Sequence, residues 1–326
     1  MRQGRIRTLF SAAMRVREVG VIIPLVFAVI FFAVNNNVFL SSANIMNVFR
    51  NTSFVFITAI GMTFLIISGA FDLSVGSVYA FAGVFAGILM TSGVSVLLSI
   101  LIATIASGLF FGGINGFFVQ RIGLPPLLAT LGSMNIARGI VTGVQKGIPV
   151  YPLPDSFEAI GQGSLFKGTA VEIPFVVLIA VGLGLIAMFV LKKTVYGRMV
   201  CAVGGNIETA RLSGIPTKKV AFSVYILVSS LAAFAGILVA SRLGSAQPNV
   251  GIGYELQAIA SVVIGGTSLA GGAGTIAGTF LGSLFMATIS NGMTLIRVSP
   301  FWQQLVLGIV LLLACSLDNL RDFLKR

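Results

Sequence analysis

The residue types that most often carry out catalysis are scarce in this chain. Histidine is absent, which excludes imidazole bases, histidine metal ligands and histidine pH switches. The two cysteines, Cys201 and Cys315, are far apart and form no Cys-x-x-Cys motif. The P-loop pattern Gly-x-x-x-x-Gly-Lys-Ser/Thr is also missing. We therefore expect no catalytic residue, no metal and no cofactor on this chain.

Ionisable residues inside apolar segments are the remaining candidates for chemistry. One small-residue segment holds Asp72, Ser74 and Gly76, and we predict a turn that Asp72 caps rather than a proton-carrying group. An ion-driven carrier usually places several ionisable groups in its spans, whereas here Asp72 and Arg138 are the candidates. We predict that Arg138 extends toward the outer surface, with pairing to Glu255 as the alternative.

The composition places these residues in a membrane protein. Of 326 residues, 56% are hydrophobic and 9% are charged, against about 25% charged in an ordinary soluble domain. Apolar runs of about 20 residues predict membrane-spanning helices. We expect about ten spans, although the second and third are hard to separate and the fifth and eighth are polar or short. The runs are 20–35, 52–70, 73–92, 95–119, 124–143, 173–191, 220–241, 256–270, 274–291 and 300–317.

The net charge of +12 is better explained by orientation than by nucleic-acid binding. Lys and Arg collect on the cytoplasmic side of membrane proteins. With a cytoplasmic N-terminus, the inner segments, among them 1–18, 192–219 and 318–326, hold fifteen of the 21 basic residues, and the outer segments, with loop 144–172, hold five. We predict one transmembrane domain over 1–326, cytoplasmic termini and no nucleic-acid partner.

Two glycine-rich segments interrupt the apolar pattern. The run 265–274 is too flexible for a regular helix, so it predicts a break between two spans that lines a path or marks a close helix crossing. Segment 69–77 has a similar plan, and prolines open both the fifth and the tenth run. Together these matches predict two five-helix halves, inverted relative to each other in the membrane.

The inner loop contains a short helix with clear end signals. Asn206 is a plausible N-cap, and Glu208 in the first turn suits the helix dipole. Gly214 stands where a left-handed C′ residue is expected, and Pro216 follows as a stop. A helix of about two turns is unstable alone. It must therefore dock on its own membrane helices or in a cleft of a cytoplasmic motor.

Several stretches resemble the permease subunits of bacterial ATP-binding-cassette importers for monosaccharides, the ribose-permease type. The similarity covers nearly the whole chain from about residue 45, and the block 197–292 is highly specific. The matching stretches include 71–77, 113–116, 128–139, 203–215, 245–256 and 258–272. The resemblance implies an all-α polytopic fold of the type II importer kind in the bacterial inner (plasma) membrane.

The resemblance also implies partners. A second permease copy, identical or related, would complete the path within membrane lipid. A cytoplasmic ABC ATPase would bind ATP and Mg, and a periplasmic sugar-binding protein would dock on loops 144–172 and 242–255. The position matching the family's ATPase contact is 204–214. The residues expected to couple are Gly204, Gly205, Asn206, Glu208, Ala210, Arg211 and Gly214.

The implied function is inward passage of a monosaccharide, a pentose or hexose of the ribose or allose type. Another small polar solute, such as a furanose-like quorum signal or a nucleoside, fits the same importer type. An ion-coupled carrier and a membrane scaffold are the other classes. Amide and hydroxyl side chains suit a sugar path, although a neighbouring helix can equally satisfy each of them. The candidates are Asn115, Asn135, Thr267, Ser268 and Asn291.

Overall fold

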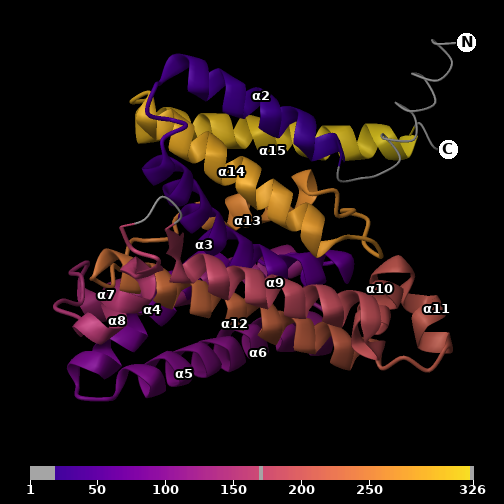
Figure 1. Ribbon diagram of the computed structural model, residues 1–326. Coiled ribbons are helices and arrows are strands. Elements are labelled where there is room, and N and C mark those ends of the chain that lie inside the picture. The colour runs from indigo at the N-terminus through magenta and orange to yellow at the C-terminus, as the bar shows by residue number, and fades with distance from the viewer. Residues whose placement is uncertain (1–18, 169–171, 324–326) are drawn as a thin grey trace, which may run out of the picture.

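The chain folds into a bundle of helices with one small β-hairpin (Figure 1). The computed structural model describes residues 19–168 and 172–323, so the predicted N-terminal segment 1–18 and the last three residues of the predicted tail lie outside it. The hairpin pairs β1 (Ser164–Leu165) with β2 (Ile173–Pro174). The longer helices are α2 (Val19–Asn35), α3 (Ser42–Ile67), α4 (Val75–Thr91), α7 (Pro126–Gln145), α9 (Phe175–Lys193), α12 (Thr217–Leu243), α14 (Ile276–Leu295) and α15 (Pro300–Phe323). The shorter ones are α5 (Val96–Ser107), α6 (Gly113–Phe117), α8 (Asp155–Gln162), α10 (Val195–Gly205), α11 (Ile207–Leu212) and α13 (Tyr254–Ile264), with π-helical η1 (Gly108–Gly112) and η2 (Phe118–Ile122).

The expected all-α membrane architecture is confirmed. Six helices of the described chain are long and apolar enough to cross a membrane, and four further apolar helices are shorter. One of the six, Val96–Ile122, is a single rod that joins α5, η1, α6 and η2. The count of ten spans and the inverted halves stay predictions.

Several helix boundaries differ from the apolar runs, and two of them have a clear local cause. Helix α3 begins at Ser42, well before the run 52–70, because the Ser41 hydroxyl caps it by accepting from the backbone N–H of Asn44 at 3.3 Å. Its first turns are polar, so hydropathy hides them although the helix is continuous. Helix α13 ends at Ile264 rather than near 270, because the glycine-rich segment follows.

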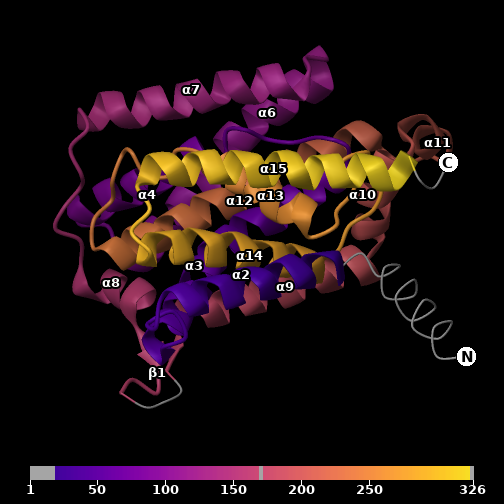
Figure 2. The ribbon, with the colours of Figure 1, turned by 90° about the horizontal axis from the view of Figure 1, so that it is seen from above.

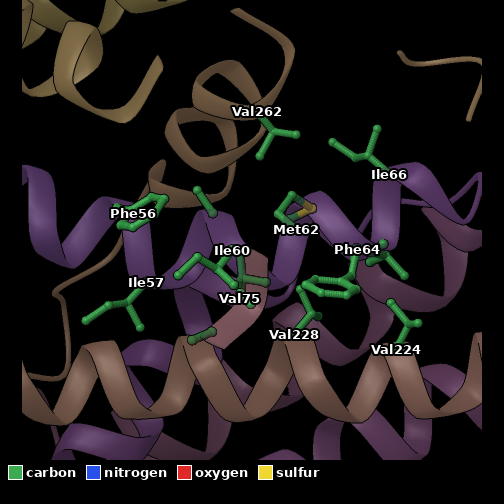
Figure 3. Close-up of a cluster of buried hydrophobic side chains, with 14 of the residues drawn as sticks. Phe56, Ile57, Ile60, Met62, Phe64, Ile66, Val75, Val224, Val228 and Val262 are labelled. Carbon is green, nitrogen blue, oxygen red and sulfur yellow. The ribbon is translucent and has the colours of Figure 1, made fainter. Parts of the chain in front are cut away.

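Helix α3 forms the centre of the core, and 89% of the residues in its most apolar 18-residue stretch are buried. Figure 3 shows Ile60 and Phe64 on the side facing Val224 and Val228 of α12, with Val262 of α13 on the other side. Apolar lipid gives little hydrophobic drive between membrane helices, so close van der Waals packing must hold them together. A helix that is apolar all round is suited to this central position.

Close backbone contact brings α4 against α12. A Cβ atom at Gly236 of α12 would lie 2.0 Å from the carbonyl oxygen of Tyr79 in α4, so only glycine fits there. Small residues at such crossings allow tight packing in membranes. The crossing fixes α4 on the core helix α12.

The bundle has two distinct ends (Figure 1). Helices α10 and α11 lie at one end, here called the α11 end, together with the start of α2 and the end of α15. Helix α8 and the β-hairpin lie at the opposite end, here called the α8 end (Figure 2). Figure 2 also shows α7 along one flank of the bundle, with α9 and α2 toward the other.

Candidate functional site

A buried carboxylate holds the break between α3 and α4. Asp72 is fully buried, and its Oδ1 accepts from the backbone N–H of Ser74 at 2.7 Å and from the Ser74 hydroxyl at 2.6 Å. Its Oδ2 accepts from the Asn115 amide at 3.0 Å. A buried carboxylate needs such partners, since an unpaired one is very costly. Asp72 therefore shapes its own turn and ties that turn to a distant helix.

Asn115 belongs to this buried cluster. It lies in α6 between the two π-helical turns η1 and η2, which change the helical register on either side. Its amide nitrogen donates to Asp72 and to the Ser74 hydroxyl, both at 3.0 Å. Its Oδ1 is buried with no hydrogen-bond partner among the described residues. Asn115 was predicted to line the path, and its side-chain nitrogen is hydrogen-bonded to the turn between α3 and α4.

Arg138 of α7 points into the protein, so the expected extension toward the outer surface is wrong. Its Nη1 donates to the carbonyl oxygens of Pro248 at 2.7 Å and Val250 at 3.0 Å. Its Nη2 donates to the carbonyl of Gly76 at 3.3 Å. Within the described chain it forms no ion pair with Glu255. A planar guanidinium with several donors can satisfy three carbonyls where the start of α4 meets the loop between α12 and α13.

Replacing Arg138 by lysine is expected to lower the free energy of unfolding by roughly 1.5–3 kcal/mol, the value of hydrogen bonds to a charged group. The ammonium group cannot span carbonyls from two segments. Thermal unfolding in detergent measures the change, with Arg297→Lys as the control because Arg297 is exposed. Equal melting of both variants would contradict the proposed tie.

The other predicted path residues are dispersed. Thr267 and Ser268 are buried in the segment between α13 and α14. Asn291 of α14 forms a reciprocal amide pair with Asn44 of α3, with N···O distances of 2.9 and 3.0 Å. Asn135 is exposed on α7 and donates to a carbonyl of its own helix at 2.9 Å. With Asn115, the five residues therefore lie on four separate elements, and their place on a path stays a prediction.

The predicted break at 265–274 is confirmed. Helix α13 ends at Ile264, and α14 begins at Ile276. Gly266, Gly271 and Gly272 have positive φ, which a regular helix cannot contain. The backbone N–H of Gly272 donates to the carbonyl of Ile67 at 2.8 Å, so this break is joined to the end of α3.

The predicted short helix is α11, and its end signals are confirmed. The Asn206 side chain accepts from the backbone N–H of Thr209 at 2.9 Å. Gly214 has φ +79° and donates to Arg211 O at 3.0 Å, and Ile215 donates to Ala210 O at 3.1 Å. These two bonds form a Schellman motif. Local sequence therefore sets both ends of α11.

The surface of α11 combines charged and apolar side chains. Glu208 and Arg211 pair at 2.8 Å with both side chains about two-thirds exposed, so the pair adds little stability. Ala210 is buried within the chain, at 3% exposure. Ile207 and Leu212 are 53% and 83% exposed, although α11 lies outside the six long spans. The sequence analysis did not single out Ile207 and Leu212. They could have been found as two large apolar residues in a strongly basic loop.

Helix α10 links α11 to the core through backbone contact. A Cβ atom at Gly204 would lie 1.7 Å from the carbonyl oxygen of Ile67 and 2.9 Å from the nitrogen of Gly272. At its other end, the Tyr196 hydroxyl lies 2.9 Å from the Ser223 hydroxyl of α12. Burial raises the pKa of Tyr196, so the phenol stays neutral. Helix α10 therefore contacts α3, the 265–275 break and α12 directly.

Comparison with known proteins identifies the class. The family model described as "Branched-chain amino acid transport system / permease component" matches residues 44–315. The chain belongs to this family of transport permeases and is a multi-pass membrane protein.

Individual relatives are similar along their length. The chain is 39% identical to the ribose import permease protein RbsC of Bacillus subtilis, covering 93% of each chain. It is 37% identical to RbsC of Escherichia coli K12, covering 96% of this chain and 97% of that protein. It is 36% identical to the xylose transport system permease protein XylH of Haemophilus influenzae, covering 89% of this chain and 92% of that protein. The resemblance to ribose-type permeases is confirmed, and no solved structure matches the chain.

Proposed function

We propose that this chain is the membrane subunit of an ATP-driven, binding-protein-dependent importer that moves a monosaccharide inward. The observation that carries the proposal is α11, a capped helix outside the long spans with exposed Ile207 and Leu212. Exposed apolar side chains beside a charged pair are suited to a protein partner. Because the chain has no P-loop, that partner supplies ATP hydrolysis and binds ATP and Mg.

The proposed orientation follows from this docking surface. The α11 end faces the cytoplasm, where α11 sits on the ABC ATPase, and the termini lie on that side. The α8 end faces the periplasm and receives a sugar-loaded binding protein. A second permease copy completes the passage within lipid. Closure of the ATPase on ATP displaces α11, and the contact of Gly204 with Ile67 transmits the movement to the spans.

The substrate is proposed to be a pentose or hexose, because the similar relatives are named as ribose and xylose permeases. Uptake of radiolabelled D-ribose and D-xylose into proteoliposomes containing this chain, its ATPase and its binding protein tests the proposal. ATP-dependent accumulation of either sugar is the expected result. Uptake by this chain alone, driven by a proton gradient and indifferent to ATP, would overturn it.

Substituting Leu212 by glutamine, or Arg211 by alanine, is expected to reduce ATPase binding by roughly tenfold or more, since central interface residues carry 2 kcal/mol or more. Both side chains are exposed, so folding should be unaffected. Co-purification of the ATPase and sugar-stimulated ATP hydrolysis measure the loss. Lys167→Gln near the β-hairpin is the control, and full coupling in both α11 variants would show that the contact lies elsewhere.

A further inference from the structure

A cavity of about 330 Å³ with polar and apolar lining residues lies between α3, α4, α12, α13 and α14, on the half of the bundle away from α11. Asn51 on its wall precedes Ile67, which touches α10, by sixteen residues of α3, or about 24 Å of helix. Arg242, which also lines the cavity, lies beside α8, whose Gln162 donates to the Arg242 carbonyl at 3.2 Å. The cavity is therefore at the α8 end, where a solute from the binding protein would arrive.

Hydrogen-bonding groups are held in place on one side of this cavity. The Arg242 guanidinium donates to the Oδ1 atoms of Asn51 and Asn47 and lies 5.7 Å from the Phe54 ring centre. These contacts fix the Asn51 amide so that its nitrogen stays available as a donor. The side chains of Gln257 and Ser290 also line the cavity and make no hydrogen bonds among the described residues.

Aromatic rings also line the cavity. The rings of Tyr79 and Tyr254 lie 4.6 Å apart between centroids and are tilted by 41°. The Tyr254 hydroxyl is buried beside the Tyr79 hydroxyl, its neighbour in a side-chain hydrogen bond. In such a pair one phenol donates to the other, so one O–H remains to donate to a ligand. The ring faces offer an apolar surface to C–H groups.

The composition of the wall restricts the class of ligand. Among the described residues, no carboxylate lines the cavity, which disfavours a cationic ligand or a metal ion. Amide, hydroxyl and guanidinium groups together with aromatic rings suit a molecule with hydroxyls on its edges and an apolar ring face. The volume is at the small end for ligand pockets, which suits one sugar ring.

We propose that this cavity is a monosaccharide-binding site on the way in from the binding protein. Asn51, Gln257 and Ser290 hydrogen-bond the sugar hydroxyls, and Tyr79 and Tyr254 pack against the ring. The assignment rests on the proposed function and adds a site to it. None of the residues predicted from sequence to line the path takes part. Binding must be weak enough for the sugar to move on.

The test is protection of a cysteine from labelling, which needs no transport. In the full chain with Cys201 and Cys315 replaced by serine, Ser290→Cys is reacted with a polar maleimide in the absence of the ATPase. D-ribose or D-xylose at millimolar concentration is expected to slow the reaction severalfold. Thr294→Cys, one turn further along α14 and exposed, should react at the same rate with and without sugar.

A second variant separates binding from accessibility. Gln257→Ala is expected to raise the sugar concentration that gives half protection by roughly threefold to tenfold, the loss of one hydrogen bond. Gln145→Ala, an amide on α7 outside the cavity, should leave it unchanged. If the intact importer takes up a sugar that gives no protection, the binding site is wrong but the proposed function stands. Equal protection by gluconate and by the neutral sugars would overturn its assignment to neutral monosaccharides.

Discussion

Replacing Gly204 by alanine is expected to lower sugar uptake by roughly tenfold or more, the largest effect that a single methyl group should have in this chain. The new Cβ atom would lie 1.7 Å from the carbonyl oxygen of Ile67, which is backbone and cannot rotate away. The end of α10 must then separate from α3, and α11 loses its rigid link to the spans. Uptake and ATP hydrolysis in proteoliposomes with the ATPase and binding protein measure the effect.

The matched control for this variant is Gly182→Ala in α9. A Cβ atom there would meet nothing within 4 Å, so the same exchange should leave uptake near that of the original chain. We expect Gly204→Ala to lose uptake but to bind the ATPase normally, because α11 keeps its own caps. Normal uptake in Gly204→Ala would show that the contact with Ile67 does not transmit movement.

Replacing Asp72 by leucine is expected to lower the free energy of unfolding by roughly 2–6 kcal/mol, because each buried donor left unpaired costs about 1–3 kcal/mol. Of the three donors to Asp72, the backbone N–H of Ser74 and the amide of Asn115 are the two counted, because the Ser74 hydroxyl can rotate toward another acceptor. Both are buried where water does not reach them easily. A lower melting temperature in detergent and a smaller amount of protein in the membrane are the measurements.

Asp72→Asn separates this structural role from a proton-carrying one. The oxygen of the new asparagine side chain still accepts from Ser74. If the Asn115 amide rotates by 180°, its Oδ1, which is unpaired in the original chain, can accept from the nitrogen of the new amide. We therefore expect a much smaller loss of stability and continued uptake. A stable Asp72→Asn variant without uptake would instead indicate that the carboxyl group titrates during transport, as in an ion-coupled carrier.

Local signals in the sequence were sufficient where structure depends on neighbours along the chain. The ends of α11 follow from Asn206 and Gly214, because a cap and a left-handed C′ residue act within one helical turn. The breaks near Asp72 and at 265–274 follow from glycine content for the same reason. The membrane class follows from composition, because lipid imposes apolar residues along a whole span.

Long-range contacts are what the sequence does not show. The inward position of Arg138 has no sequence signal, because its partners are carbonyl oxygens, which every residue carries. The polarity of Asn115 is visible in the sequence, whereas its contact with Asp72 depends on two π-helical turns. Polarity alone cannot show whether an amide meets solute or protein.

The sequence by itself determined the membrane class, the helix breaks and the capped helix α11, because each is set by composition or by residues within a turn of one another. Only the tertiary structure decided which of these features touch. It placed Gly204 against Ile67, and it gathered Asn51, Tyr79, Tyr254 and Gln257 around one cavity. Those residues come from separate helices, and their proximity depends on how the helices pack, which no local pattern encodes.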